Sequence, residues 1–202
     1  GVMFDVQIVR HRGPAGTHVG AVLVPKSAEK PLPVVIDARG VDPTYSPLDL
    51  ADPPNSLVTL GAAAGGFVIL VPAYRGNRLL ADGRQFAADG DPSDAWDGAT
   101  DDALSFLSAA LSMTPQADAD RVAILGESRG GTVALLAGIR DRRISVVLDV
   151  VGPVDQFAAQ DSHLGWTWAE LLATDMAAGE PPTLRDNSGQ KFDHFFDRGE
   201  GL

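Results

Sequence analysis

The chain has 202 residues, 45% of them hydrophobic and 21% charged, which are ordinary values for one globular domain. Its formal net charge of −11 would repel a phosphate backbone, so we expect no nucleic-acid partner. The absence of cysteine excludes disulfides, thiolate nucleophiles and cysteine–zinc sites. No apolar run reaches about eighteen residues, the length a membrane-spanning helix needs, and nothing distinguishes a cytoplasmic from an exported protein.

Short β-rich runs predict six strands in the first three quarters of the chain. The first two runs are separated by Gly13-Pro14-Ala15-Gly16 and predict a hairpin with a longer loop. The third and fourth runs are almost continuously apolar, which is typical of strands covered on both faces. The expected strands span residues 6–10, 19–24, 33–38, 67–72, 121–125 and 145–151.

Helical patterns separate the later strands. Ser93 or Asp94 is a candidate cap for a helix that runs to about Met113. Its apolar residues fall on one face, namely Ala99, Ala103, Phe106, Leu107, Ala110 and Leu111. Further helices are expected over 57–64 and 131–139. A hairpin followed by strand–helix alternation predicts an α/β fold, a mostly parallel sheet with helices on both faces.

The sharpest motif is Gly126-Glu127-Ser128-Arg129-Gly130, which lies between a predicted strand and a predicted helix. In this context Gly-x-Ser-x-Gly predicts a nucleophile elbow, a tight turn that holds the serine hydroxyl above the sheet. Glycines are needed because a Cβ would clash at so sharp a turn, and the following helix directs its N-terminal N–H groups at the site. The alternative is a plain glycine-rich turn.

A second motif, Tyr74-Arg75-Gly76, follows the strand at 67–72. Asp118-Ala119-Asp120-Arg121-Val122 leads into the elbow, and Gly152-Pro153-Val154-Asp155 follows the next strand. Together these elements resemble the prolyl oligopeptidase family of α/β-hydrolases over roughly residues 19–155. The resemblance implies a serine hydrolase that cleaves an ester or peptide bond through an acyl-enzyme, with a small-molecule ester or peptide as substrate. It implies no cofactor and no metal.

The resemblance also implies roles for three residues. Ser128 would be the nucleophile, and the Tyr74 hydroxyl and the backbone N–H of Arg129 would form the oxyanion hole. One such donor is worth about 2.7–4 kcal/mol in the transition state. The alternative for Tyr74 is an aromatic side chain that only packs against the end of the sheet.

Two neighbouring positions complete the expected site. Arg75 is expected to be structural and to pair with Asp101 or Asp102 on the following helix. Relatives have a His-Gly element after the third strand, whereas this chain has Arg39-Gly40. The departure concerns the entrance of the site and not the nucleophile.

The catalytic acid and base remain unassigned. In α/β-hydrolases they follow the serine in the order acid, then histidine, each after a later strand. The 74 residues after Ser128 contain one strand-like run, although Ser128, Asp155 and His194 occur in the required order. His11 and His18 lie in the opening hairpin, before the serine in chain order, and neither His163 nor His194 follows a strand that would hold it rigidly.

We therefore expect residues 1–202 to form a single, incomplete α/β-hydrolase domain without its C-terminal strands. A C-terminal fragment or a second chain would then complete the site. Residues 156–202 are expected to form a lid-like or irregular segment, in which Trp166 and Trp168 line an acyl pocket or simply pack a helix. The competing hypothesis is a catalytically inactive hydrolase-fold module that binds or scaffolds. Residues 37–42 match no nucleotide-binding loop.

Overall fold

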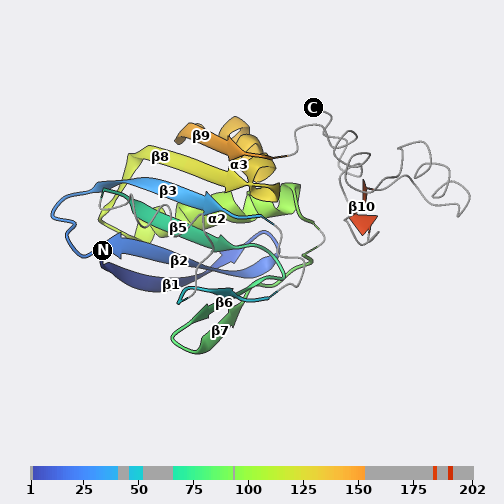
Figure 1. Cartoon of the computed structure of the whole chain (residues 1–202), viewed down its shortest axis with the longest axis horizontal. Helices are drawn as coiled ribbons and strands as arrows, with labels where there is room; N and C mark the ends of the chain where they lie inside the picture. The colour runs from blue at the N-terminus through green and yellow to red at the C-terminus, as the bar shows by residue number, and fades with distance from the viewer. Residues whose placement is uncertain are drawn as a thin grey trace, which may run out of the picture.

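The computed structural model describes residues 2–40, 46–51, 66–92, 94–152, 184–185 and 191–192. A six-stranded sheet in the order β1-β2-β5-β3-β8-β9 forms the body of the molecule (Figure 1). Its strands are β1 (Phe4–Gly13), β2 (Gly16–Pro25), β3 (Leu32–Ala38), β5 (Val68–Ala73), β8 (Ala117–Glu127) and β9 (Ile144–Val150). β1 pairs with β2, and β2 with β5, in antiparallel orientation. β5, β3, β8 and β9 pair in parallel. The predicted mostly parallel sheet with an N-terminal hairpin is confirmed.

The opening hairpin is tighter than the sequence indicated. Gly13 and Gly16 are themselves paired, so the strands are joined by Pro14 and Ala15 alone. The expected longer loop is therefore wrong. The two glycines extend the ladder because their flexible backbone fits the end of a tightly twisted hairpin, with Gly16 at a φ of 123°.

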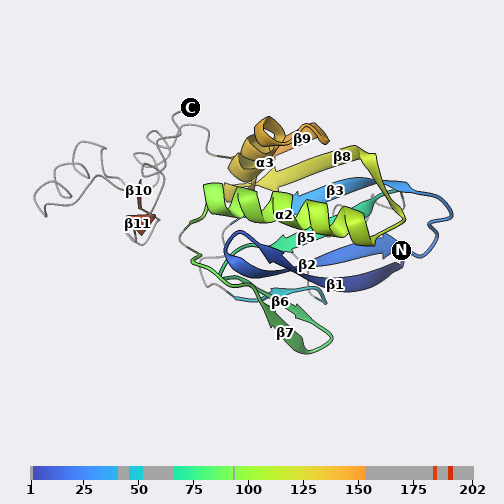
Figure 2. The ribbon, with the colours of Figure 1, turned by 180° about the vertical axis from the view of Figure 1, so that it is seen from behind.

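One face of the sheet is covered by two helices, α2 (Asp97–Met113) and α3 (Arg129–Arg140), as Figure 2 shows. The apolar face predicted for α2 is buried, with Leu111 partly so. Phe106 packs so close to β2 that a Cβ on Gly20 would lie 2.3 Å from its ring. The helix begins later than predicted, yet Asp94 still accepts the first-turn N–H of Gly98 at 2.8 Å.

The opposite face carries a second apolar cluster and a small three-stranded sheet. Its strands are β4 (Leu48–Asp49), β6 (Arg78–Ala81) and β7 (Arg84–Ala87). Asp82 and Gly83 connect the last two, both with positive φ, in the turn that Asp-Gly favours between paired strands. The helix predicted over 57–64 lies outside the described residues.

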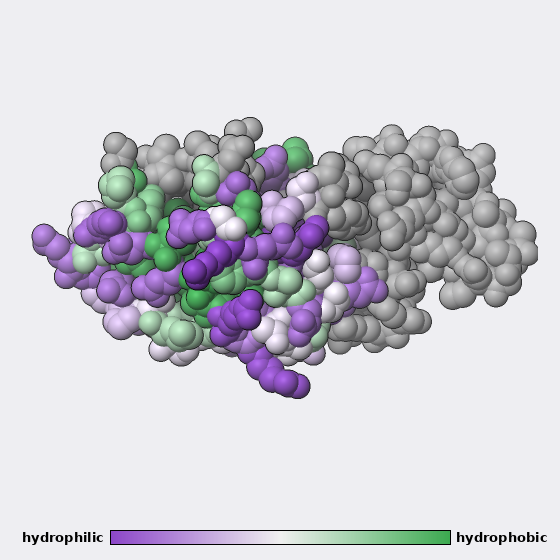
Figure 3. Space-filling model, turned by 90° about the horizontal axis from the view of Figure 1, so that it is seen from below, coloured by the Kyte–Doolittle hydropathy of each residue, from purple (hydrophilic) through white to green (hydrophobic). Residues whose placement is uncertain are grey.

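The two edges of the main sheet differ in chemistry. On β1 the exposed side chains are Val6 and several polar or charged residues, among them Asp5, Arg10 and Arg12, and the view from below shows hydrophilic side chains interspersed with hydrophobic ones (Figure 3). On β9 the side chains of Val146, Leu148 and Val150 are 49%, 49% and 46% exposed. Charged residues protect an edge strand from pairing with other chains, and an apolar edge lacks that protection.

Outside the main sheet, β10 (Leu184–Arg185) and β11 (Lys191–Phe192) pair only with each other. They are the described part of the segment expected to be lid-like or irregular. Among the described helices, none is long and apolar enough to cross a membrane.

The packing of Phe106 predicts a large effect of its removal. Phe106→Ala should lower the free energy of unfolding by about 3–5 kcal/mol, because it deletes a fully buried aromatic ring that fills the space over Gly20. Met113→Ala at the exposed end of the same helix is the matched control and should change it by less than about 0.5 kcal/mol. Urea unfolding followed by far-UV circular dichroism measures both. Equal effects would contradict this account of the core.

Candidate active site

The carboxyl ends of three parallel strands bring the predicted site residues to one edge of the sheet. Tyr74 follows β5, Gly40 lies two residues beyond β3, and Ser128 follows β8. Gly40 and Ser128 are close neighbours, since a Cβ placed on Gly40 would lie 3.2 Å from the Ser128 Cβ. Ligands in open α/β sheets bind at this edge.

Ser128 occupies a strained turn between β8 and α3. Its φ of 54° and ψ of −125° lie outside the regions that residues with a side chain normally adopt, and it is exposed. A Cβ on Gly126 would lie 1.9 Å from the Gly130 carbonyl oxygen, and one on Gly130 would lie 1.7 Å from the Ala38 carbonyl oxygen. The glycines of the motif are therefore required by backbone contacts on both sides of the serine.

The neighbouring strand β9 anchors this turn. The Ser128 N–H donates to the Val150 carbonyl at 2.9 Å, and the Gly152 N–H donates to Asp149 Oδ1 at 2.8 Å. The same Asp149 oxygen would lie 2.0 Å from a Cβ on Gly131, so it approaches the start of α3 closely. Asp149 was not singled out from the sequence, where its one visible feature is a carboxylate inside an apolar run.

Tyr74 is buried in the main core cluster, with 1% of its surface exposed. Its hydroxyl is buried as well and forms no hydrogen bond within the described part of the chain. Burial raises the pKa of Tyr74 to about 12, although the nearby guanidinium groups of Arg129 and Arg39 act in the opposite direction. The phenol is thus a protonated hydrogen-bond donor at neutral pH.

Arg129 also lies at this edge, and its side chain is only 5% exposed. The guanidinium carbon is 4.9 Å from the centroid of the Tyr74 ring, and Nη2 donates to the Gly40 carbonyl at 3.2 Å. The sequence had indicated a role for the backbone N–H of Arg129 alone.

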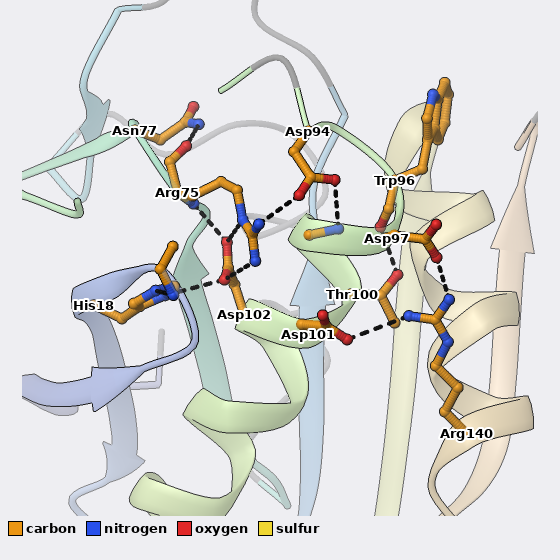
Figure 4. Close-up of polar contacts among 12 residues, drawn as sticks. His18, Arg75, Asn77, Asp94, Trp96, Asp97, Thr100, Asp101, Asp102 and Arg140 are labelled. Atoms are coloured by element: carbon orange, nitrogen blue, oxygen red, sulfur yellow. Dashed lines mark hydrogen bonds and ion pairs between the residues drawn. The ribbon is translucent and has the colours of Figure 1, made fainter. Parts of the chain in front are cut away.

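A buried charge network holds the residue after Tyr74 (Figure 4). Of the two expected partners, Arg75 pairs with Asp102. Asp102 Oδ2 accepts the Arg75 backbone N–H at 2.7 Å and Nε at 3.1 Å, while Oδ1 accepts Nη2 at 3.0 Å. Asp94 binds the remaining nitrogen, Nη1. Asp101 instead pairs with Arg140 at the surface.

The two described histidines are engaged in structural contacts. His18 Nε2 accepts the Ala15 N–H at 3.3 Å, and Nδ1 lies 3.2 Å from Asp102 Oδ1. His11 Nε2 lies 3.0 Å from Ser105 Oγ, and its pKa is lowered by burial and by the neighbouring His18. These contacts with Asp102 and Ser105 involve helix α2, and no contact with Ser128 accompanies them among the described residues.

Several candidates lie outside the described residues, namely Ser93, Asp155, His163, His194, Trp166 and Trp168. The catalytic acid and base therefore stay unassigned. Within the described ranges no three His, Asp or Glu side chains gather as a metal site.

A serine in this turn, above the carboxyl edge of a mostly parallel sheet, defines the α/β-hydrolase class. The sequence model of the prolyl oligopeptidase family matches residues 55–180, more than half of the chain, and the chain belongs to that family. No curated protein matches the sequence.

Solved structures share the fold at low sequence identity. Pyrococcus horikoshii acylaminoacyl peptidase is 16% identical with a TM-score of 0.58, over 78% of this chain and 24% of its own. The α/β-hydrolase GrgF from Penicillium sp. sh18 is 19% identical with a TM-score of 0.56, over 94% and 62%. DcsB, solved with a substrate analogue, is 16% identical with a TM-score of 0.56, over 90% and 57%. The chain thus spans less than two thirds of each.

The charge network predicts unequal effects at two adjacent aspartates. Asp102→Ala should lower the free energy of unfolding by about 3–5 kcal/mol, because it leaves the Arg75 guanidinium buried without its main partner. Asp101→Ala removes only a partly exposed partner of Arg140 and should cost less than about 1 kcal/mol. Urea unfolding of both variants tests this. A small effect at Asp102 would mean that the network does not hold the chain here.

Proposed function

We propose that the protein is a serine hydrolase that cleaves an ester or peptide bond through an acyl-enzyme on Ser128. The observation that carries the proposal is the strained, exposed Ser128 at the strand-to-helix turn, in a chain of the prolyl oligopeptidase family. A backbone this strained persists only where the surrounding structure imposes it, and such strain is concentrated at functional sites.

In the proposed reaction the Ser128 Oγ attacks the substrate carbonyl carbon and transfers its proton to the base. The carbonyl oxygen then carries the negative charge, which the Tyr74 hydroxyl and the Arg129 backbone N–H stabilise. Collapse of the intermediate releases an alcohol or an amine, protonated by the same base, and leaves the acyl group on Oγ. Water attacks in the second half and restores the serine. Support for Tyr74 is its buried, protonated hydroxyl, which bonds to no described group.

The acid and base are proposed to come from outside the described residues, from a further segment or a second chain placed beside β9. Two observations support this placement. The exposed apolar side chains of β9 form the edge next to the elbow, and the structural relatives are longer than this chain. His18 is buried, with Nε2 bonded to the Ala15 N–H and Nδ1 beside Asp102, which argues against it as the base.

Labelling with a fluorophosphonate probe tests the proposal, because the probe reacts only with an activated serine. The full product of the reading frame should be labelled on Ser128, with the 202-residue chain measured alongside it. Ser128→Ala should abolish labelling, and Tyr74→Phe should slow it by about 10²–10³-fold, the loss expected for one oxyanion donor. Peptide mass spectrometry locates the label.

Ser112→Ala is the matched control, since Ser112 is exposed on α2 and bonds only to the helix backbone. It should leave labelling unchanged. A folded full-length product that stays unlabelled would overturn the proposal in favour of an inactive binding module. Labelling that survives Ser128→Ala would place the nucleophile elsewhere.

A further inference from the structure

The side chain of Arg129 has no assigned role, yet it is buried where the three parts of the candidate site meet. It starts from the residue next to Ser128, crosses the ring of Tyr74 and ends on the carbonyl of Gly40. Gly40 in turn is a close neighbour of Ser128. The β8–α3 turn, the residue after β5 and the loop after β3 are therefore joined by this one side chain.

The contact with Tyr74 has the geometry of a cation–π interaction. A guanidinium within about 6 Å of a ring centroid is attracted by the negative face of the ring, and the attraction is stronger where water is excluded. Here the separation is 4.9 Å and both side chains are at most 5% exposed. The Tyr74 hydroxyl has no hydrogen-bond partner among the described residues, so the contact with Arg129 adds to the core packing that orients the phenol.

We propose that the Arg129 side chain is a positioning residue that holds the Tyr74 phenol against the elbow and ties it to Gly40. This inference rests on the proposed function of Ser128 and Tyr74, and it adds a role for a side chain in addition to the backbone N–H of the same residue. The cation also favours the phenol as a donor, because a positive charge beside the ring stabilises the negative charge that the phenol oxygen gains as it donates.

The first test reads Tyr74 directly and requires no enzymatic activity. The chain has two tyrosines, Tyr45 and Tyr74, so Tyr45→Phe leaves Tyr74 as the only phenol. Stopped-flow jumps to alkaline pH record tyrosinate absorbance before the protein unfolds. Arg129→Met in this background should move the ionisation of Tyr74 to higher pH, because it removes a cation that lowers the Tyr74 pKa. Arg129→Lys should restore part of the shift.

Arg140→Met is the matched control, since Arg140 lies at the other end of α3 and pairs with Asp97 and Asp101. It should leave the ionisation of Tyr74 where it is. An unchanged ionisation in Arg129→Met, with the fold intact by circular dichroism, would overturn the proposal.

The second test asks whether Arg129 acts through the hydroxyl of Tyr74. In the full-length product Arg129→Met should slow phosphonylation of Ser128 by about 2- to 30-fold, the range expected for one cation–π contact. In the Tyr74→Phe background the same substitution should have almost no further effect, and all of these variants keep the backbone N–H. Equal slowing in both backgrounds would reduce Arg129 to a packing role.

The two proposals fail in different ways. If Ser128 is labelled neither in the 202-residue chain nor in the full-length product, the proposed function fails. The ionisation of Tyr74 still shows whether the Arg129 side chain lowers the pKa of the phenol. If Tyr74→Phe slows labelling and Arg129→Met does not, the proposed function stands and the positioning role is wrong.

Discussion

The site depends on one close approach, the contact between the turn that carries Ser128 and the end of β3. Gly130 packs on the Ala38 carbonyl and Gly40 packs on Ser128, so the β8–α3 turn and the loop after β3 touch backbone to backbone. At Gly130 a Cβ would lie 1.7 Å from the Ala38 carbonyl oxygen, so only a residue without a Cβ fits there. Strand β8, which leads into the turn, is paired in parallel with β3 on one side and β9 on the other. This pairing fixes the start of the turn and so maintains the strain at Ser128.

A second constraint acts on the neighbouring strand. Tyr74 and Arg75 are adjacent in sequence but differ in bonding: the Tyr74 hydroxyl has no hydrogen-bond partner among the described residues, whereas the backbone N–H and the guanidinium of Arg75 are both bonded. Asp102 takes both the backbone N–H and the guanidinium of Arg75, so it fixes main chain and side chain together. Removing one partner of a buried ion pair strongly destabilises the fold. The Arg75–Asp102 pair therefore acts as a rigid support beside the Tyr74 hydroxyl, a donor with no hydrogen bond to a described residue.

Local patterns were sufficient to predict the main sheet and the elbow. The apolar runs of β3 and β5 are long enough and β-branched enough to indicate buried strands, and Ser128 stands in a motif whose flanking elements are recognisable. The hairpin of β6 and β7 was missed although Asp82-Gly83 is a strong turn sequence, because its strands are short and carry polar residues.

Two contacts at the site that the sequence did not reveal join residues far apart in the chain. The choice between Asp101 and Asp102 as the partner of Arg75 was left open, although Asp102 lies on the buried face of α2 with Ala99 and Phe106. The packing of Arg129 on Tyr74 bridges 55 positions, and periodicity carries no information on such a pair.

The position of Arg129 also shows what Arg39-Gly40 contributes at the place where relatives have a His-Gly element. Where a His-Gly element was expected, the chain keeps the glycine, whose carbonyl accepts from Arg129 and whose missing side chain leaves room for Ser128. Arg39 adds a second positive charge that acts on the Tyr74 phenol. The two cations act on the buried phenol more strongly than the neighbouring carboxylates of Asp37 and Asp102, in a protein whose overall charge is −11. A site that must stabilise a developing oxyanion benefits from this local excess of positive charge, because exposed carboxylates farther away act through water and are screened, whereas charges inside the core act through a lower dielectric.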